Sequence, residues 1–222
     1  FHIDASDAAS VDRSGEGKVT AWRDLISGNQ AKVRGNVSVI TNAVNGLDVL
    51  RFGANGVSAV DFPAWHDAEA PISLFIVWQR TAEQADGKPW QRMVTCKSAN
   101  DKKGFAVAAA MRGQAGVIEP VIYTISHAAA LPLPITFGSV HPPKFGNHLR
   151  GDLAEVLIYN RRFHDPDEFH AVEQYLMDKW SCRVDPKEQG WLRPDNNLPP
   201  VKHANQGWPM HDQPNAGKWD YY

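Results

Sequence analysis

The pattern of apolar and polar positions is clearest between Gly151 and Trp180, where it predicts a strand followed by a helix. The segment Leu153–Tyr159 is short and rich in β-branched and aromatic residues, which favours a buried strand. After Asp165 the period of the pattern changes to that of a helix. The apolar residues at helical spacing are Phe169, Val172, Leu176 and Trp180.

The start of this helix is marked by three residues. Asp165 is a suitable N-cap and Pro166 suits the first helical position. Glu168 follows the cap by three residues, so we expect its side chain to reach back to the amide of Asp165. The polar positions, which we expect on the solvent side, are Glu168, Glu173, Asp178 and Lys179.

The first 150 residues have the pattern of an all-β protein, since Gly, Asn, Asp and Pro separate short β-prone runs. The segment Ile72–Gln79 is apolar on both alternating faces, so we expect it in the middle of a sheet that is covered on both sides. The predicted strands are Val19–Trp22, Val37–Ile40, Asp48–Phe52, Ile72–Gln79, Arg92–Cys96, Phe105–Ala109, Val121–Ile125 and Ile135–Phe137.

Composition limits the classes of function. The chain has 222 residues, 43 % of them hydrophobic, which suits one domain over residues 1–182 and an extended appendage over residues 183–222. A formal net charge of -2 with interspersed signs argues against a nucleic-acid partner. The apolar runs are much shorter than the roughly 20 residues of a membrane span. Because the chain begins with Phe1, we expect that an upstream segment such as a signal peptide has been removed.

The appendage, residues 183–222, is rich in proline and poor in aliphatic residues, so it cannot form a core of its own. Its aromatic side chains are unfavourable in water, and we expect them to pack on their own domain or on a neighbouring molecule. They are Trp191, Trp208, Trp219, Tyr221 and Tyr222.

Several motifs in order along the chain resemble one known family. They are Asp4-Ala5, Val19-x-x-Trp22-x-Asp24, Ser27-Gly28-Asn29, Asn45-Gly46, Ile135–Gly138, Gly151-x-Leu153-Ala154-Glu155-Val156 and Tyr159-Asn160-Arg161. Together they resemble the bacterial LamG-like modules of the concanavalin A-like lectin and glucanase superfamily over residues 1–182. The resemblance implies an all-β, two-sheet antiparallel jelly-roll sandwich with one short C-terminal helix.

One region departs from that family. From Met111 to Pro134 the chain is short and alanine-rich where the family carries a full strand and a hairpin. A missing strand would open an edge of a sheet, and such edges are usually protected. The appendage or a partner could cover this edge.

Catalysis is not expected from the carboxylates. Enzymes of this superfamily would need two carboxylates two residues apart on one strand, so that both enter the cleft. Asp152 and Glu155 are three residues apart and are predicted to face opposite sides of their strand. Asp165, Asp167 and Glu168 are better explained as charges that favour the start of a helix.

No motif indicates a metal or another cofactor. The loop with Asp4, Asp7 and Asp12 could offer oxygen ligands to calcium, but Asp4 and Asp24 are more simply explained as turn and cap residues. His164 and His170 flank the predicted helix start and are interpreted as solvated polar residues.

The two cysteines, Cys96 and Cys182, match no zinc or redox spacing. The sequence leaves two alternatives open, a disulfide between them and two free, buried thiols.

Tryptophan positions suggest where a sugar could bind, because a pyranose ring stacks on an indole while its hydroxyls seek polar groups. Trp22, Trp78 and Trp180 lie in or at the end of regular elements and are expected in the core. Two others lie in polar segments, where the alternative is that each packs its loop onto the sheet. The candidate ligand-binding residues are Trp65, His66, Trp90 and Arg92.

The sequence therefore predicts a non-catalytic, extracytoplasmic module (extracellular, cell-surface or periplasmic) that binds a glycan or a protein at a surface. A first alternative is a structural subunit of a larger assembly, docked through its aromatic appendage as a homo- or hetero-oligomer. A second alternative is a degenerate relative of polysaccharide hydrolases or lyases.

Overall fold

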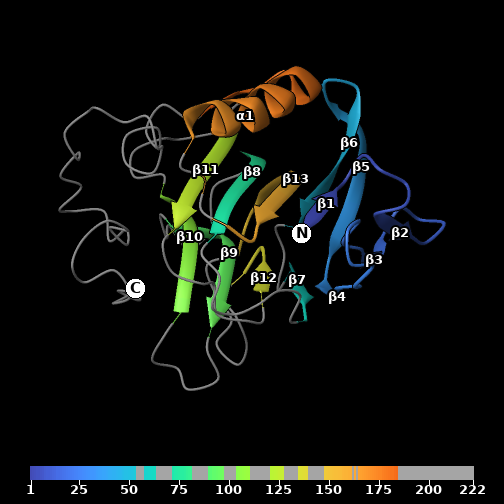
Figure 1. Cartoon of the computed structure of the whole chain (residues 1–222). Coiled ribbons are helices and arrows are strands. Elements are labelled where there is room, and N and C mark those ends of the chain that lie inside the picture. Colours follow the sequence, from blue (N-terminus) through green and yellow to red (C-terminus); the bar gives the residue numbers. More distant parts are fainter. Residues whose placement is uncertain are drawn as a thin grey trace.

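The structure is a computed structural model and consists mostly of β-strands with one α-helix in the part that it describes (Figure 1). That part comprises residues 1–53, 58–63, 72–81, 90–97, 104–110, 121–127, 135–139, 148–161, 163 and 165–184. Within it, no helix is long and apolar enough to cross a membrane.

The described strands form three hydrogen-bonded sheets. The seven-stranded sheet has the order β14 (Arg183–Val184), β11 (Val121–His127), β8 (Ile72–Arg80), β13 (Gly151–Tyr159), β6 (Leu47–Phe52) and β5 (Val37–Val44), and β1 (His2–Asp4) also pairs with β13. The five-stranded sheet has the order β10 (Gly104–Ala110), β9 (Trp90–Lys97), β12 (Ile135–Phe137), β7 (Ser58–Phe62) and β4 (Lys32–Gly35). The strands β2 (Val11–Arg13) and β3 (Val19–Trp22) form a small hairpin sheet.

All strands predicted from the hydrophobic pattern are present, and so is the helix, α1 (Pro166–Trp180). The pairing differs from the expected purely antiparallel arrangement at one place, because β14 runs parallel to β11. Arg183 and Val184 pair there with Val121 and Ile122. The first residues of the appendage thus pair with β11, which lies within Met111–Pro134, the region that was expected to open a sheet edge.

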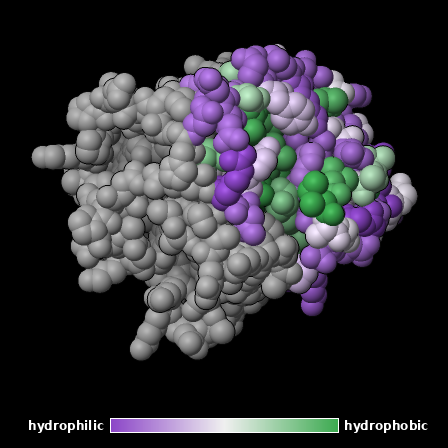
Figure 2. All heavy atoms as spheres, viewed as in Figure 1, coloured by the Kyte–Doolittle hydropathy of each residue, from purple (hydrophilic) through white to green (hydrophobic). Residues whose placement is uncertain are grey.

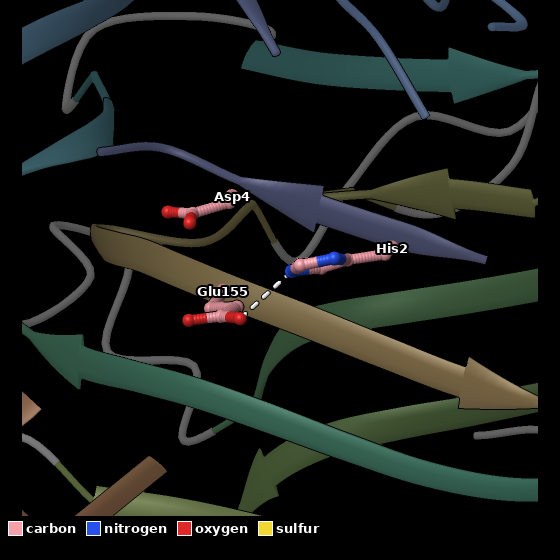
Figure 3. Close-up of side chains that lie close together, drawn as sticks. All are labelled: His2, Asp4 and Glu155. Carbon is pink, nitrogen blue, oxygen red and sulfur yellow. Dashed lines mark hydrogen bonds and ion pairs between the residues drawn. The ribbon is translucent and has the colours of Figure 1, made fainter. Parts of the chain in front are cut away.

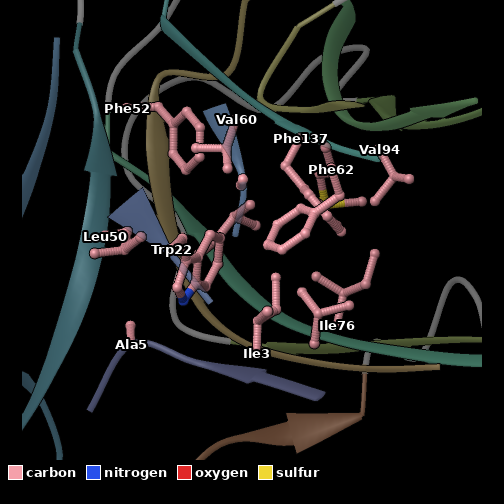
Figure 4. Close-up of a cluster of buried hydrophobic side chains, with 14 of the residues drawn as sticks. Ile3, Ala5, Trp22, Leu50, Phe52, Val60, Phe62, Ile76, Val94 and Phe137 are labelled. Carbon is pink, nitrogen blue, oxygen red and sulfur yellow. The ribbon is translucent and has the colours of Figure 1, made fainter. Parts of the chain in front are cut away.

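The larger hydrophobic core is shared by the seven-stranded and the five-stranded sheets (Figure 4). Trp22 is fully buried in it, as the sequence predicted. Phe62 and Phe137 contact each other edge to face, with ring centroids 5.8 Å apart. The residues of the larger core that Figure 4 labels are Ile3, Ala5, Trp22, Leu50, Phe52, Val60, Phe62, Ile76, Val94 and Phe137.

A second core lies between the seven-stranded sheet and α1. Strand β8 supplies both cores: Ile76 and Trp78 pack in the larger one, and Phe75 and Val77 pack against the helix side. This confirms the prediction that Ile72–Gln79 is covered on both faces. Trp180, the last residue of α1, is fully buried in this second core, also as predicted.

The helix start agrees with the sequence in part. Asp165 is the N-cap, and its side chain accepts a hydrogen bond from the amide of Asp167 at 2.9 Å. Glu168 does not reach back to the cap, because the Arg161 guanidinium binds its carboxylate with two hydrogen bonds. Glu173 and Lys179 were expected to be exposed. Instead, Glu173 is buried, with only 1 % exposure, and Lys179 is partly buried.

Two tight turns depend on left-handed backbone. Asn45 and Gly46 both have positive φ and connect β5 to β6, as expected of an Asn-Gly hairpin. Gly138 follows β12 with a φ of 81°, and a Cβ atom added there would overlap the ring of Phe52. Phe52 is 1 % exposed, so its ring has little room to move.

Hydrophilic side chains dominate the described part of the surface shown in Figure 2. Among the described residues, the exposed large hydrophobic side chains are those of Ile26 and Tyr175. These two single residues do not make an extended apolar docking surface.

Candidate functional site

A row of polar residues crosses the face of the five-stranded sheet that points away from the larger core. Thr136 of β12 is paired in register with Asp61 of β7 and with Thr95 of β9. Their chain neighbours Val60, Phe62, Val94, Ile135 and Phe137 belong to the core. Because side chains alternate along a strand, Asp61, Thr95 and Thr136 share the opposite, outer face.

The row is held by an ion pair. Arg34 of β4 binds both carboxylate oxygens of Asp61: its Nη2 donates to Oδ1 at 2.7 Å and its Nε donates to Oδ2. The Thr136 hydroxyl donates to the same Oδ1 at 2.7 Å. Asp61 therefore receives three hydrogen bonds, which fix its orientation on the sheet. The side chains of Arg34 and Asp61 keep 18 % and 19 % exposure, so this end of the row meets solvent.

Within the part of the chain that the structure describes, the hydroxyl of Thr95 has no hydrogen-bond partner, although Thr95 is only 5 % exposed. A buried polar group without a partner costs about 1–3 kcal/mol, and most native proteins avoid it. Thr95 lies directly beside Thr136 in the pairing of β9 and β12. The row thus ends at a hydroxyl that can still donate and accept a hydrogen bond.

Of the ligand-binding residues predicted from the sequence, two lie on the same strand as a member of this row. Trp90 and Arg92 belong to β9, the strand that carries Thr95, and their side chains lie outside the described part. Trp65, His66 and all five aromatic residues of the appendage also lie outside it. Sequence reasoning missed the row itself. The signal was a polar residue with an apolar residue on either side in each of β7, β9 and β12.

A second polar cluster surrounds Glu155 on the helix side of the seven-stranded sheet (Figure 3). A β-bulge in β13, between Leu153 and Glu155, turns Ala154 and Glu155 to the same side. Asp152 also faces this side, beside Arg51 and Gln79, which hold it with three hydrogen bonds. The prediction that Asp152 and Glu155 face opposite sides was wrong, because the extra residue shifts the alternation.

Glu155 is fully buried and accepts four hydrogen bonds. Its Oε1 accepts from His2 Nε2 at 2.8 Å and from the Tyr175 hydroxyl at 3.0 Å. Its Oε2 accepts from Trp180 Nε1 at 2.7 Å and from Lys179 Nζ at 2.8 Å. One carboxylate therefore joins β1, β13 and the end of α1.

The charges in this cluster stabilise one another. Burial alone would raise the pKa of Glu155, but hydrogen bonds from His2, Lys179 and Trp180 lower it below its ordinary value. Burial alone would lower the pKa of Lys179, but its contacts with Asp4 and Glu155 raise it above the ordinary value.

The lowered pKa of Glu155 predicts an acid-sensitive stability. The unfolded chain takes up this proton at about 4.5, whereas the folded chain takes it up only at lower pH. The contribution of Glu155 is therefore complete above that value and is lost as the pH falls through the folded pKa. We expect urea denaturation at a series of pH values to show this loss, and the Glu155→Gln variant to show a flatter acid limb.

The cluster also tests the metal prediction. One ligand atom each from His2, Asp4 and Glu155 lie within 4.8 Å of one another, which is close enough for a cation. However, Lys179 Nζ contacts both carboxylates and already supplies a positive charge there. The carboxylates suggested for calcium have protein donors: Asp4 binds Ser6 and Lys179, Asp7 binds the amide of Ala9, and Asp12 binds Arg23.

Cys182 follows α1 as a free thiol, half-buried against the second core, so no disulfide joins it to Cys96. Cys96 lies in β9, and its side chain is outside the described part. Burial raises the pKa of Cys182 to about 11, which makes its thiol unreactive.

No family model matches the chain, and no curated protein matches it. Among solved structures, it is similar to a Trypanosoma rangeli sialidase in complex with sialic acid, with 13 % identity and a TM-score of 0.46 over 80 % of this chain and 32 % of that one. It is also similar to a Phanerochaete chrysosporium exo-β-1,3-galactanase with galactose (13 %, TM-score 0.33, 58 % of this chain, 27 % of that one). A third is a family 35 carbohydrate-binding module from Clostridium thermocellum (15 %, TM-score 0.30, 58 % and 90 %). The chain thus spans about a third or less of the two enzymes, and at these scores the similarities assign no function.

Proposed function

We propose that this chain is a non-catalytic binding module that takes a glycan on the outer face of its five-stranded sheet. The observation that carries the proposal is the buried hydroxyl of Thr95, which has no partner among the described residues and lies at the end of a row of polar groups that are hydrogen-bonded to one another. A ligand hydroxyl that bonds to Thr95 would remove the free-energy penalty of the orphaned group. We further propose that the fold is a two-sheet jelly roll of the LamG-like type and that the module works outside the cytoplasm.

The chemistry of the row suits a sugar better than an anion or a cation. Arg34 and Asp61 neutralise each other, and the two threonines are uncharged. A ligand with many hydroxyls matches such a site, because each hydroxyl both donates and accepts. Trp90 and Arg92, on the same strand as Thr95, supply the residue types that would stack on a pyranose ring and bind its oxygens.

The non-catalytic part of the proposal is supported by how the described carboxylates are held. Asp152 and Glu155 share a face of β13, but both are buried and bound to protein donors. Asp61 is likewise bound by Arg34 and Thr136. A general acid or a nucleophile has to reach the substrate, and these carboxylates are occupied by structural partners.

A threonine-to-valine substitution tests the site. Valine has nearly the shape of threonine but no hydroxyl, so Thr95→Val is expected to weaken glycan binding about tenfold or more. Because the substitution also removes an unsatisfied buried group, the free energy of unfolding should stay the same or rise. A glycan array identifies the ligand, calorimetry compares affinities, and urea denaturation gives the stability.

The matched control is Thr20→Val, the same substitution at an exposed position of β3. It should leave glycan affinity unchanged. The site would be wrong if Thr95→Val bound the glycan as tightly as the unaltered chain, and glycan binding would be wrong if the array retained nothing. Release of shorter sugars from the bound glycan would contradict the non-catalytic assignment.

A further inference from the structure

The cluster around Glu155 places an amine against a carboxyl group with a buried carboxylate beside both. Lys179 Nζ contacts Asp4 Oδ2, and it also donates to Glu155 Oε2 at 2.8 Å. Asp4 and Glu155 are directly opposite each other in the antiparallel pair of β1 and β13. In Figure 3 the side chains of Asp4 and Glu155 lie near each other on these two strands. Asp4 is 5 % exposed and Glu155 is fully buried.

We propose that Lys179 and Asp4 condense to form an intramolecular amide bond, which covalently ties β1 to the last turn of α1, with Glu155 as the proton carrier. The inference is independent of the proposed glycan site, which lies on the other sheet. It rests on three features: a nucleophile in contact with its target, donors that polarise the target, and a carboxylate that can move the protons.

The bonding changes balance without any further reactant. Lys179 gives a proton to Glu155, and its neutral Nζ attacks Cγ of Asp4, forming the C–N bond. Glu155 then delivers this proton to Oδ2, takes a second proton from the now cationic Nζ and passes it to Oδ2 as well, and the C–Oδ2 bond breaks so that Oδ2 leaves as water. In total, an ammonium and a carboxylate become an amide and one water molecule, nothing is oxidised or reduced, and Glu155 returns to its starting state.

The other carboxylate oxygen of Asp4, Oδ1, has hydrogen bonds that favour this attack on Cγ. Oδ1 accepts hydrogen bonds from the amide of Ser6 at 2.8 Å and from the Ser6 hydroxyl at 2.7 Å. When Nζ attacks Cγ, negative charge develops on Oδ1, and these two donors stabilise it as an oxyanion hole does. The leaving oxygen, Oδ2, is the one that contacts Lys179.

The surroundings restrict water and hold the reacting groups together. Lys179 Nζ lies 5.2 Å from the ring centre of Trp180 and 5.7 Å from that of Tyr175, and the Lys179 side chain is 20 % exposed. Holding two groups in contact gives effective concentrations on the order of 10⁵ M or higher. Condensation also replaces a largely buried ion pair, which is expensive to desolvate, with a neutral amide.

The resting protonation state slows the reaction but does not prevent it. The ion pair and the neutral pair of amine and carboxylic acid contain the same number of protons, so the reactive form is a minor tautomer of the resting one. A bond that forms once in the life of a protein needs a single turnover.

Intact-mass spectrometry of the full chain tests the proposal. We expect the folded protein to be lighter by one water molecule than its sequence requires. Digestion should then yield a branched peptide that joins the segment containing Asp4 to the segment containing Lys179. Lys179→Arg keeps the positive charge but cannot form this amide, so it should have its full calculated mass. Glu155→Gln keeps the shape without the proton carrier and should also have its full mass.

The matched control is Lys18→Arg, at an exposed lysine, which should still lose one water. A full calculated mass for the unaltered chain after prolonged incubation of the folded protein would overturn the proposal without any variant. A loss of water that persists in Lys179→Arg would place the lost water elsewhere and would also overturn it. Retention of the bond in Glu155→Gln would remove Glu155 from the reaction.

Discussion

Replacing Glu155 with glutamine is expected to lower the free energy of unfolding by about 3 kcal/mol. The carboxylate accepts four hydrogen bonds, whereas a glutamine amide offers one oxygen and directs an NH₂ group at two of the four donors. Buried donors that lose their acceptor cost about 1–3 kcal/mol each, and a broken buried charge pair costs about 3–5 kcal/mol. Urea denaturation of chains with verified mass measures the difference.

Glu168→Gln is the matched control for this substitution. Glu168 also accepts two charged hydrogen bonds, from Arg161, but this ion pair lies in solvent. Exposed ion pairs contribute little, so stability should hardly change. If the two variants were equally stable, burial would not be the reason for the contribution of the cluster around Glu155 to the free energy of unfolding. Lys179 remains a hydrogen-bond donor after acylation, so at least this loss is expected with or without the amide bond.

Gly138→Ala is expected to destabilise the fold by about 2–4 kcal/mol, for two reasons that a control can separate. The left-handed backbone at Gly138 costs a non-glycine residue about 1–2 kcal/mol. In addition, the new methyl group would overlap the buried ring of Phe52, which adds overpacking of about 1–3 kcal/mol. The change is measured by urea denaturation.

Gly28→Ala isolates the backbone contribution, because Gly28 has a similar φ of 73° and nothing lies within 4 Å of the position of the added atom. Gly28→Ala should lower the free energy of unfolding only by the backbone contribution of about 1–2 kcal/mol. Equal losses at Gly28 and Gly138 would show that the Phe52 ring moves aside, so that the end of β12 is less tightly packed than the structure indicates.

Local periodicity carried most of the secondary structure. The two-sided apolar pattern of Ile72–Gln79 and the helical spacing up to Trp180 reflect the burial of each element, so the sequence alone was sufficient to predict them. Trp22, Trp78 and Trp180 are buried for the same reason. Asp165 predicted the helix start because capping is a local interaction.

The sites depended on pairing between distant segments, which periodicity does not encode. The β-bulge at Ala154 reverses the side on which Glu155 lies, and no residue type in this segment predicts the bulge. Lys179 was assigned to solvent because its partners, Asp4 and Glu155, come from other elements. The row of Asp61, Thr95 and Thr136 exists only once the register of β7, β9 and β12 is known.

The pairing of β1 with β13 has a consequence for the order of events during synthesis. Ile3, near the start of the chain, pairs with Val156, and β13 also needs β6 and β8 beside it. Contacts this distant in sequence form slowly, because a long loop must close first. On the ribosome, the first segment would stay without its partner until nearly the whole domain has emerged. The N-terminal strand should therefore join the sheet at a late stage of folding.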